Sequence, residues 1–517
     1  MKRQAYNPYL PSGEYVPDGE PHVFDDRIYI YGSHDKFNGT LYCENDYVCW
    51  SAPVTDLSDW QYEGVIYKKN QDPINSDGKM QLWAPDIMVG FDGRYYLYYC
   101  FPFYPVIGVA VCDCPCGSFD FYGWVKYEDG TVYGQRKGDV LPFDPGVLND
   151  QGTFFLYSNY SQNTLRMLPE EFAQPVLDGM KTLEDTMKEF VALIGDDAIM
   201  DSLMRINGYG SKVLKLAEDM LTVQSVNDLI PGIDNSENTG FEGHEFYEAS
   251  SIRKIGEKYY FIYSSYLSHE LCYAISDKPD KDFVYGGTII SNGDVGLPGV
   301  TKIQPHNYYG NNHGGLVKCD GSWYIFYHRH TDCNEQSRQG CAEPVTIADD
   351  GSISQVEMTS CGLNGEPLSG KGTYPSYIAC NLAAVSGACK YDASNPEAAA
   401  ALKAVHPYIT QDVADIEVPS YDKQVQYIRN MRQGTKIGFK YFQMQGVTTI
   451  EVETRGNSGK LIVSTSWDGP SYGEILLDDS AYWRIYSTSI EIPNGKQALY
   501  FTYQGTGAID FKSFTLG

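Results

Sequence analysis

The sequence predicts an all-β protein, in which a five-bladed β-propeller with a helical insertion is followed by a β-sandwich of the jelly-roll type. One observation behind this prediction is a strand motif that recurs five times. The other is a series of alternating strands in the C-terminal part, beyond a glycine-rich linker. Since 517 residues exceed what one hydrophobic core usually organises, we expect two domains, residues 1–370 and residues 371–517.

The recurring motif is a polar or glycine turn, followed by an aromatic-rich strand that ends in small or polar residues. Propellers produce repeats of this kind, because each small four-stranded sheet buries its faces only against its neighbours around a ring. Five units therefore predict five blades. The five copies of the motif are residues 26–33, 93–100, 152–159, 257–265 and 321–329.

The first unit presents a carboxylate and a hairpin in one short span. Asp18 lies between a proline and a glycine, in a segment that suits a tight turn and disfavours helix. The hairpin follows directly, with Asp25 and Asp26 as its turn. The second unit repeats this arrangement, because Asp86 follows a proline just before its hairpin and is three residues from Trp83. An isolated Asp of this kind is usually a turn residue, but the shared position indicates a functional role for both.

A helical segment separates the third and fourth units. We expect a helix or a helix pair within an insertion of about residues 167–211, because apolar residues there follow helical spacing. The insertion could be a lid over a pocket or a decoration on the outside, and we favour decoration. The predicted apolar stripe is Leu177, Met180, Leu183, Met187, Phe190 and Leu193.

The fourth unit holds the strongest acid candidate. Glu248 is surrounded in sequence by aromatic and aliphatic residues over positions 246–252, which would desolvate its carboxyl group and raise its pKa. A general acid needs this property. Glu242 and Glu245 lie in a more polar stretch and suit the role less well. In the fifth unit, His313 lies in a glycine-rich turn, where it is either hydrogen-bonded or a metal ligand.

Composition and charge narrow the range of ligands that the chain is expected to bind. The chain has 14% aromatic residues, with 43 Tyr, and 51 Gly, which is typical of β-rich proteins that bind the flat faces of sugars. The formal net charge of −28 opposes phosphate backbones and anionic membranes. No stretch approaches the length of a membrane span. We therefore expect a carbohydrate ligand, no nucleic acid and no membrane.

The N-terminus lacks the apolar run of a signal peptide. The thirteen cysteines are odd in number and lack the dense spacing of a disulfide-stapled module, so we expect mostly reduced thiols. Together these features predict a cytoplasmic protein.

Four motifs together resemble glycoside hydrolase family 43. They are residues 17–21 with 32–35, residues 83–86, residues 247–252, and residues 311–314 with Arg338. The resemblance covers about residues 7–353. It implies a five-bladed propeller and an inverting enzyme that acts on arabinose- and xylose-containing glycans. The sequence departs from many members in one place, where Pro-Asp-Gly surrounds Asp18 in place of Ala-Asp-Pro.

The resemblance also implies roles for single residues. Asp18 would be the general base, Glu248 the general acid, and Asp86 the carboxylate that tunes and orients the acid. Inversion requires such an acid and base about 6.5 to 9.5 Å apart, with a water between the base and the sugar.

Further site residues follow from the same resemblance. Arg338, Trp83 and His34 would bind the substrate. His313 would lie in the central channel beside a structural calcium ion, and no organic cofactor is expected.

The C-terminal part follows the linker at residues 362–372. Its alternating strands suggest an antiparallel sandwich and resemble a family 6 carbohydrate-binding module. Asp510 occupies a place where sugar-binding members tend to carry Asn. A working sugar site and a purely structural sandwich are both open.

The predicted function is that of an exo-acting inverting glycoside hydrolase of hemicellulose degradation. It would release terminal pentoses as an α-L-arabinofuranosidase with β-xylosidase activity. The alternatives are an endo-arabinanase or a β-galactosidase-type member of the same family, and a non-catalytic carbohydrate-binding propeller. A lectin has no need of a desolvated Glu facing two Asp residues, which favours the enzyme.

Overall fold

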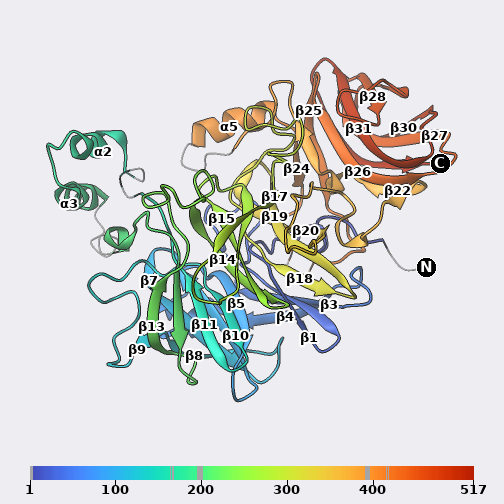
Figure 1. Cartoon of the computed structure of the whole chain (residues 1–517). Helices are drawn as coiled ribbons and strands as arrows, with labels where there is room; N and C mark the ends of the chain where they lie inside the picture. The colour runs from blue at the N-terminus through green and yellow to red at the C-terminus, as the bar shows by residue number, and fades with distance from the viewer. Residues whose placement is uncertain are drawn as a thin grey trace.

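The computed structural model describes residues 4–163, 165, 168–194, 202–390, 396–414, 416 and 419–517. The described chain is built of antiparallel sheets, with a few short helices at its periphery (Figure 1). The fold is all-β, as predicted. Among the described residues, no helix is long and apolar enough to cross a lipid bilayer.

The N-terminal part forms five sheets in succession. The first contains β1 (Glu20–Phe24), β2 (Arg27–Tyr31), β3 (Tyr47–Pro53) and β4 (Gln61–Tyr67). The second contains β5 (Trp83–Val89), β6 (Tyr95–Phe101), β7 (Tyr104–Cys112) and β8 (Asp120–Trp124). The third contains β10 (Gly146–Asp150), β11 (Thr153–Ser158), β12 (Lys212–Leu216) and β13 (Thr222–Asp228), with β9 (Lys126–Tyr127) parallel to β13.

The fourth sheet contains β14 (Phe246–Ile255), β15 (Lys258–Ser265), β16 (Glu270–Ser276) and β17 (Val284–Ser291). The fifth contains β18 (Leu316–Cys319), β19 (Ser322–Thr331) and β20 (Asn334–Val345). Short 3₁₀ turns connect some of these strands and the sheets beyond them. They are η1 (Lys69–Gln71), η2 (Pro73–Asn75), η3 (Gly362–Asn364) and η4 (Ser376–Ile378).

The five sequence repeats are the second strands of these five sheets, namely β2, β6, β11, β15 and β19. Each of these strands is paired on both sides and is buried almost throughout. A strand covered on both faces needs aromatic and β-branched residues at successive positions, and not in alternation. Burial on both faces therefore explains why this strand carries the repeat.

The first strands of the five sheets are linked around a ring. Gly19, just before β1, bridges to Gly314, just before β18, so the first sheet meets the fifth. Arg253 on β14 donates to Glu20 Oε2 (2.7 Å) and to the Leu316 carbonyl (2.8 Å), which joins three sheets. The third sheet contacts the second and the fourth through β10. The beginnings of these strands consequently face a common centre.

The predicted insertion is a helix pair, α2 (Glu170–Leu177) and α3 (Leu183–Ile194), between β11 and β12 (Figure 1). The ring of Phe172 meets that of Phe190 edge-on, and Met187 joins the apolar core beneath the second and third sheets. Two residues of the predicted stripe do not take part, because Leu177 at the end of α2 is 64% exposed and Met180 in the turn between the helices is 70% exposed. The Leu193 side chain lies outside the described residues.

The C-terminal part contains two six-stranded sheets. One is formed by β21 (Leu368–Ser369), β26 (Lys436–Met444), β31 (Gly495–Gly505), β28 (Gly459–Ser464) and β29 (Gly473–Leu477), with β23 (Asn381–Ala383) on β26. The other is formed by β24 (Tyr408–Gln411), β25 (Gln426–Arg432), β32 (Ala508–Leu516), β27 (Thr449–Gly456) and β30 (Ser480–Ser489), with β22 (Gly372–Pro375) on β32. One apolar core that includes Phe439, Phe501 and Phe514 lies between them, and α5 (Pro396–Val405) precedes β24.

The two parts are joined by buried polar contacts. The Tyr15 hydroxyl donates to Gln411 Oε1 (2.7 Å), and buried Arg329 donates to the carbonyl of Ala379 (3.0 Å). Because these groups are removed from water, separating the two parts would leave them without partners.

Candidate active site

A cavity of about 490 Å³ brings together three carboxyl groups that lie at the beginnings of first strands, and Glu335 on β20 is a fourth carboxyl group in its lining. The first three belong to Asp18, before β1, to Asp144, before β10, and to Glu248, near the start of β14. Aromatic residues form much of the remaining wall, which suits the apolar face of a sugar ring. These are Tyr42, Trp83, Phe103, Phe143, Tyr160 and Tyr247.

Asp18 is an ionised carboxylate held by the Arg338 guanidinium and the His328 ring. Its Oδ1 accepts from Arg338 Nη1 at 2.8 Å and lies 3.2 Å from His328 Nδ1. Burial alone would raise the pKa of Asp18, but Arg338 and His328 outweigh it and hold this pKa far below its usual range. Asp18 has a φ of 55°, a backbone conformation that Asp tolerates better than most residues.

Arg338 is aligned by a second carboxylate. Its Nε and Nη2 donate to the two oxygens of Asp35, each at 2.9 Å, and its guanidinium lies 4.9 Å from the centre of the Tyr42 ring. Such a bidentate pair fixes the plane of the guanidinium. Arg338 lines the cavity beside Asp18.

Glu248 has the opposite electrostatic setting. Burial, with the nearby negative charge of Asp18, raises the pKa of Glu248 to about 8. The pairing of β14 with β15 is interrupted on both sides of Glu248, and Ala249 has a φ of 66°. A bulge of this kind turns a side chain out of the regular alternation of a strand. The Glu248 side chain consequently lines the cavity.

The third carboxyl group of the cavity, Asp144, was not among the predicted residues. Its Oδ2 accepts from the backbone N–H of Ala249 at 3.1 Å, next to Glu248. Burial, together with Glu248 and Asp18, raises the pKa of Asp144 well above its usual range. A sequence signal existed, because Asp144 stands just before the first strand of its sheet, as Asp18 does, whereas Asp86 lies within β5.

The structure corrects the prediction for Asp86. This residue does not line the cavity. Its side chain is fully buried between β1 and β10, where it contacts His22 Nε2 at 2.6 Å and accepts from the backbone N–H of Val147 at 2.8 Å. A register shift in β5 between Trp83 and Asp86 points the two side chains to different surroundings. Asp144, and not Asp86, therefore lies beside Glu248.

Trp83 and His34, the two other residues predicted to bind the sugar, also lie in different surroundings. Trp83 lines the cavity, packs edge-on against Phe143, and has a buried indole N–H without a hydrogen-bond partner in the described chain. His34 does not line it. Its ring bonds the Asp46 carbonyl at 2.9 Å and Glu14 Oε1 at 3.1 Å, so it supports the loop that carries Asp35.

His313 lines the cavity and reaches from Asp144 to Glu20. Its Nδ1 is 3.6 Å from Asp144 Oδ2, and its Nε2 is 3.8 Å from Glu20 Oε1. Both Nε2 and Glu20 Oε1 are buried without a hydrogen-bond partner among the described residues. A cation or a water between them would satisfy both, and Glu20, His22 and Asp86 form a further group of potential ligands.

Lys390 reaches the cavity from the C-terminal part of the chain. Its segment runs beside Tyr309, whose N–H donates to the Cys389 carbonyl at 3.2 Å. The helices α2 and α3 contribute no residue to the lining within the described part, which agrees with decoration as their role. Glu242 and Glu245 also lie outside the lining.

Comparison with known proteins gives concordant results. The family described as "Glycosyl hydrolases family 43" matches residues 11–192. A xylosidase/arabinosidase of Thermoclostridium stercorarium is 47% identical over 519 aligned residues, which cover 100% of this chain and 99% of the relative. A xylosidase/arabinosidase of Bacteroides ovatus is 28% identical, over 63% of this chain and 88% of the relative.

Among solved structures, an arabinoxylan arabinofuranohydrolase of family 43 from Bacillus subtilis, in complex with cellotetraose, is 19% identical. It matches 99% of this chain and 97% of its own, with a TM-score of 0.48.

Proposed function

Because this chain belongs to glycosyl hydrolase family 43, we propose that it is an inverting, exo-acting glycosidase that releases terminal arabinose or xylose units from short oligosaccharides. The names of the relatives, xylosidase/arabinosidase, support this substrate class. The cavity of about 490 Å³ with its aromatic wall is of a size that a sugar unit with its neighbour fills.

One observation carries the mechanism, namely two carboxyl groups in one cavity with pKa values moved in opposite directions. Glu248, protonated near neutral pH, gives its proton to the glycosidic oxygen as the bond to the anomeric carbon breaks. Asp18, ionised, takes a proton from a water whose oxygen attacks that carbon from the opposite face. The products are the free sugar with inverted configuration and the shortened oligosaccharide.

Asp144 is the proposed partner of the acid. The two carboxyl groups share a desolvated site, so each disfavours ionisation of the other. Through its bond to the N–H of Ala249, Asp144 also fixes the backbone that carries Glu248. Arg338 keeps Asp18 ionised and lies where it can contact a sugar hydroxyl.

The architecture extends this proposal. We assign the five sheets as the blades of a five-bladed propeller, residues 1–370, and the following sandwich, residues 371–517, as a domain of the family 6 carbohydrate-binding type. Glu20 and His313, whose facing Oε1 and Nε2 atoms lack partners in the described chain, would lie beside a calcium ion, whose charge would offset the buried carboxylates there. The thirteen cysteines carry free thiols, in keeping with a cytoplasmic location.

The decisive experiment compares two variants on two kinds of substrate. Glu248→Gln should lower turnover of oligosaccharides by about 10² to 10⁴, and affect aryl glycosides with good leaving groups far less, because such groups depart without a proton. Asp18→Asn should impair both kinds alike. Glu242→Gln is the matched control, since Glu242 lies outside the cavity.

The anomer formed first, observed by NMR, tests inversion. A retained configuration, or near wild-type oligosaccharide turnover in both variants, would contradict the proposed roles. Long arabinan fragments as the main products would contradict the exo mode and favour an endo-arabinanase.

A further inference from the structure

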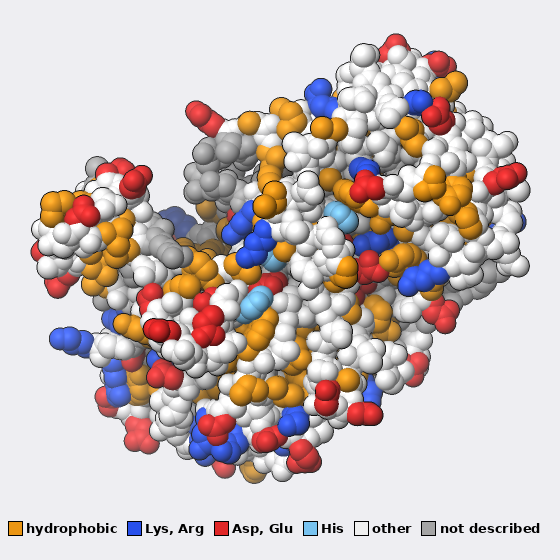
Figure 2. Space-filling model, turned by 45° about the horizontal axis from the view of Figure 1, so that its top comes forward, with side chains coloured by type: hydrophobic (Ala, Val, Ile, Leu, Met, Phe, Trp, Pro, Cys, Tyr) orange, Lys and Arg blue, Asp and Glu red, His pale blue; other side chains and the backbone are white. Residues whose placement is uncertain are grey.

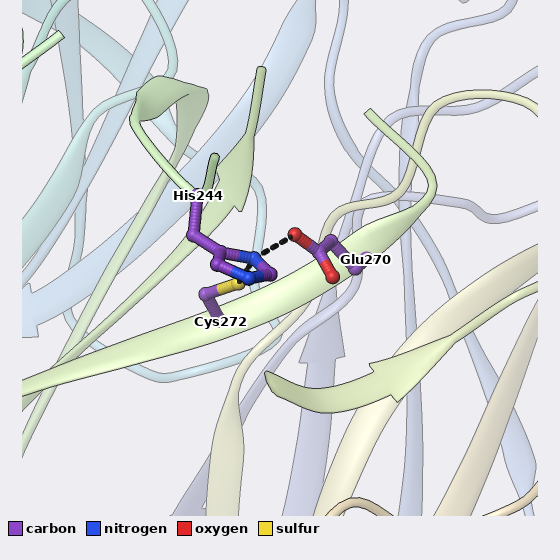
Figure 3. A group of neighbouring side chains, drawn as sticks. All are labelled: His244, Glu270 and Cys272. Atoms are coloured by element: carbon purple, nitrogen blue, oxygen red, sulfur yellow. Dashed lines mark hydrogen bonds and ion pairs between the residues drawn. The ribbon is translucent and has the colours of Figure 1, made fainter. Parts of the chain in front are cut away.

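A second cluster of reactive side chains lies in the fourth sheet, outside the catalytic cavity. It consists of His244, in the turn before β14, and of Glu270 and Cys272 on β16 (Figure 3). His244 Nδ1 is 2.6 Å from Glu270 Oε1 and 3.9 Å from Cys272 Sγ, so this nitrogen lies close to both of the other potential metal ligands. None of the three lines the cavity, and the mechanism proposed above uses none of them.

The surroundings hold these three side chains in place. Ser265 Oγ donates to Glu270 Oε1 at 2.7 Å, and Thr288 Oγ1 donates to Glu270 Oε2 at 2.9 Å. The ring of Tyr285 stacks on the His244 imidazole, with centres 4.9 Å apart and an angle of 14°. Metal sites typically have such a second layer, which orients the ligands before the ion arrives.

The group of His244, Glu270 and Cys272 is open to solvent on the side of His244. Glu270 and Cys272 are buried, whereas the His244 side chain is 35% exposed and covers them. An ion can therefore enter past the imidazole and reach the Glu270 carboxylate and the Cys272 thiol in a site from which most water is excluded. The hydrogen bond between His244 and Glu270 explains the position of the imidazole. It does not explain why a third potential ligand, the thiol of Cys272, lies beside them.

We propose that His244, Glu270 and Cys272 form a binding site for Zn²⁺ or a similar borderline divalent metal ion. Nitrogen, carboxylate oxygen and thiolate sulfur are the zinc ligands of proteins, and three protein ligands leave a fourth position for water. Bond lengths of about 2.0 to 2.3 Å in a tetrahedron place nitrogen and sulfur about 3.6 Å apart, and nitrogen and oxygen about 3.3 Å apart.

The site needs only a small adjustment to meet these values. The nitrogen–sulfur separation of 3.9 Å is already close, and the nitrogen–oxygen separation must open from 2.6 Å. Zinc binding would release the proton shared by His244 and Glu270 and the proton of the Cys272 thiol, so that the two anions balance the charge of the ion. Calcium is disfavoured, because it prefers oxygen ligands only.

The position of the site links it to the acid. His244 lies four residues before Glu248, and its carbonyl accepts from the Tyr263 hydroxyl at 2.7 Å. A bound ion would fasten this turn to β16. We therefore expect zinc to stabilise the start of β14 without contacting the substrate.

The test is zinc binding by the full chain, stripped of metal with a chelator and then dialysed against micromolar Zn²⁺. Millimolar Ca²⁺ stays in the buffer, so that the oxygen-rich channel is offered its preferred ion. The wild type should retain one equivalent of zinc and melt at a higher temperature than the stripped protein. His244→Asn, Glu270→Gln and Cys272→Ser should each bind zinc at least about tenfold more weakly.

Co²⁺ serves as a spectroscopic probe, because a thiolate bound to it absorbs in the near ultraviolet. This band should appear in the wild type and be absent in Cys272→Ser. The control is a variant with Cys112→Ser, Cys114→Ser and Cys116→Ser, which removes the other group of neighbouring thiols and should keep both the band and the zinc. Circular dichroism of each metal-free variant checks folding, and half-exposed His244 offers the change that the fold tolerates best.

Two results would overturn the proposal. One is a wild type that retains no zinc at micromolar concentration. The other is zinc retained by His244→Asn and Cys272→Ser alike, or lost only in the triple cysteine variant, which would place the ion elsewhere.

Discussion

At the scale of single residues, the site works by giving chemically similar groups different surroundings. Asp18 is buried and Glu248 is half-buried, but Asp18 has Arg338 and His328 against it, whereas Glu248 faces the negative charge of Asp18. Burial favours the neutral form of each, and only Asp18 has enough nearby positive charge to reverse this. The base therefore stays ionised while the acid keeps its proton.

This difference predicts the pH dependence of the enzyme. Because the pKa of Glu248 is raised to about 8, the protonated acid should predominate below this pH and be lost above it. The lowered pKa of Asp18 should keep the base ionised into the acid range. The logarithm of kcat/KM plotted against pH should therefore decline on the basic side near pH 8. A decline that begins near pH 5 would contradict a raised pKa for the acid.

Asp144 and Asp86 can be distinguished by the same measurement. Asp144→Asn removes the acidic group whose titration is linked to that of Glu248 in the same desolvated site, so the position of the basic limb should change. Asp86→Asn should leave the limb in place. It should instead lower the free energy of unfolding by about 1–3 kcal/mol, because it weakens buried contacts to His22 and Val147. A shifted limb in Asp86→Asn alone would restore the role first predicted for it.

At the scale of elements, irregular backbone at the beginnings of two strands determines where the side chains of the site point. Both β5 and β14 shift register near their beginnings, and both carry an alanine with positive φ there, Ala84 at 34° and Ala249 at 66°. Such backbone is uncommon for residues with a side chain, and small residues tolerate it best. In β14 it directs Glu248 into the cavity and the N–H of Ala249 to Asp144.

The strain at Ala249 can be tested directly. Ala249→Val should destabilise the protein by about 1–3 kcal/mol, because a β-branched side chain opposes this φ at a fully buried position. Ala249→Gly should be near neutral or stabilising, since glycine adopts the conformation freely. Chemical denaturation measures both changes. Equal losses in the two variants would show that side-chain packing, and not the backbone, dominates at this position.

At the scale of the whole molecule, two features bear on what the protein binds, namely its acidic surface and the contact between its two parts. Figure 2 shows Asp and Glu side chains scattered over the visible face without a continuous basic surface, in keeping with the net charge of −28. Lys390, which the C-terminal part supplies to the cavity, is a positive group there besides Arg338. The sandwich thus contributes to the pocket, whether or not it binds sugar itself.

Lys390 should therefore affect the substrate beyond the terminal sugar. Lys390→Met should raise KM for oligosaccharides several-fold and change kcat for aryl pentosides little, because a lining residue that takes no part in proton transfer contributes binding and not chemistry. Lys423→Met, an exposed change in the same part of the chain, is the control. Equal kinetics of the two variants on oligosaccharides would remove Lys390 from the binding site.

The sequence by itself determined the elements and pointed to the two carboxyl groups that we propose as base and acid. Because each second strand is buried on both faces, it carries an aromatic repeat, and Asp18 before the first strand and Glu248 in the fourth unit are both recognisable from their neighbours in the chain. Only the tertiary structure decided that Asp144, and not Asp86, lies beside Glu248, and that His34 supports a loop. It also decided that Lys390, His244, Glu270 and Cys272 meet residues that are distant in the chain. These outcomes depend on bulges and on contacts between separate sheets, which bring together side chains far apart in the chain and leave no pattern at any one position.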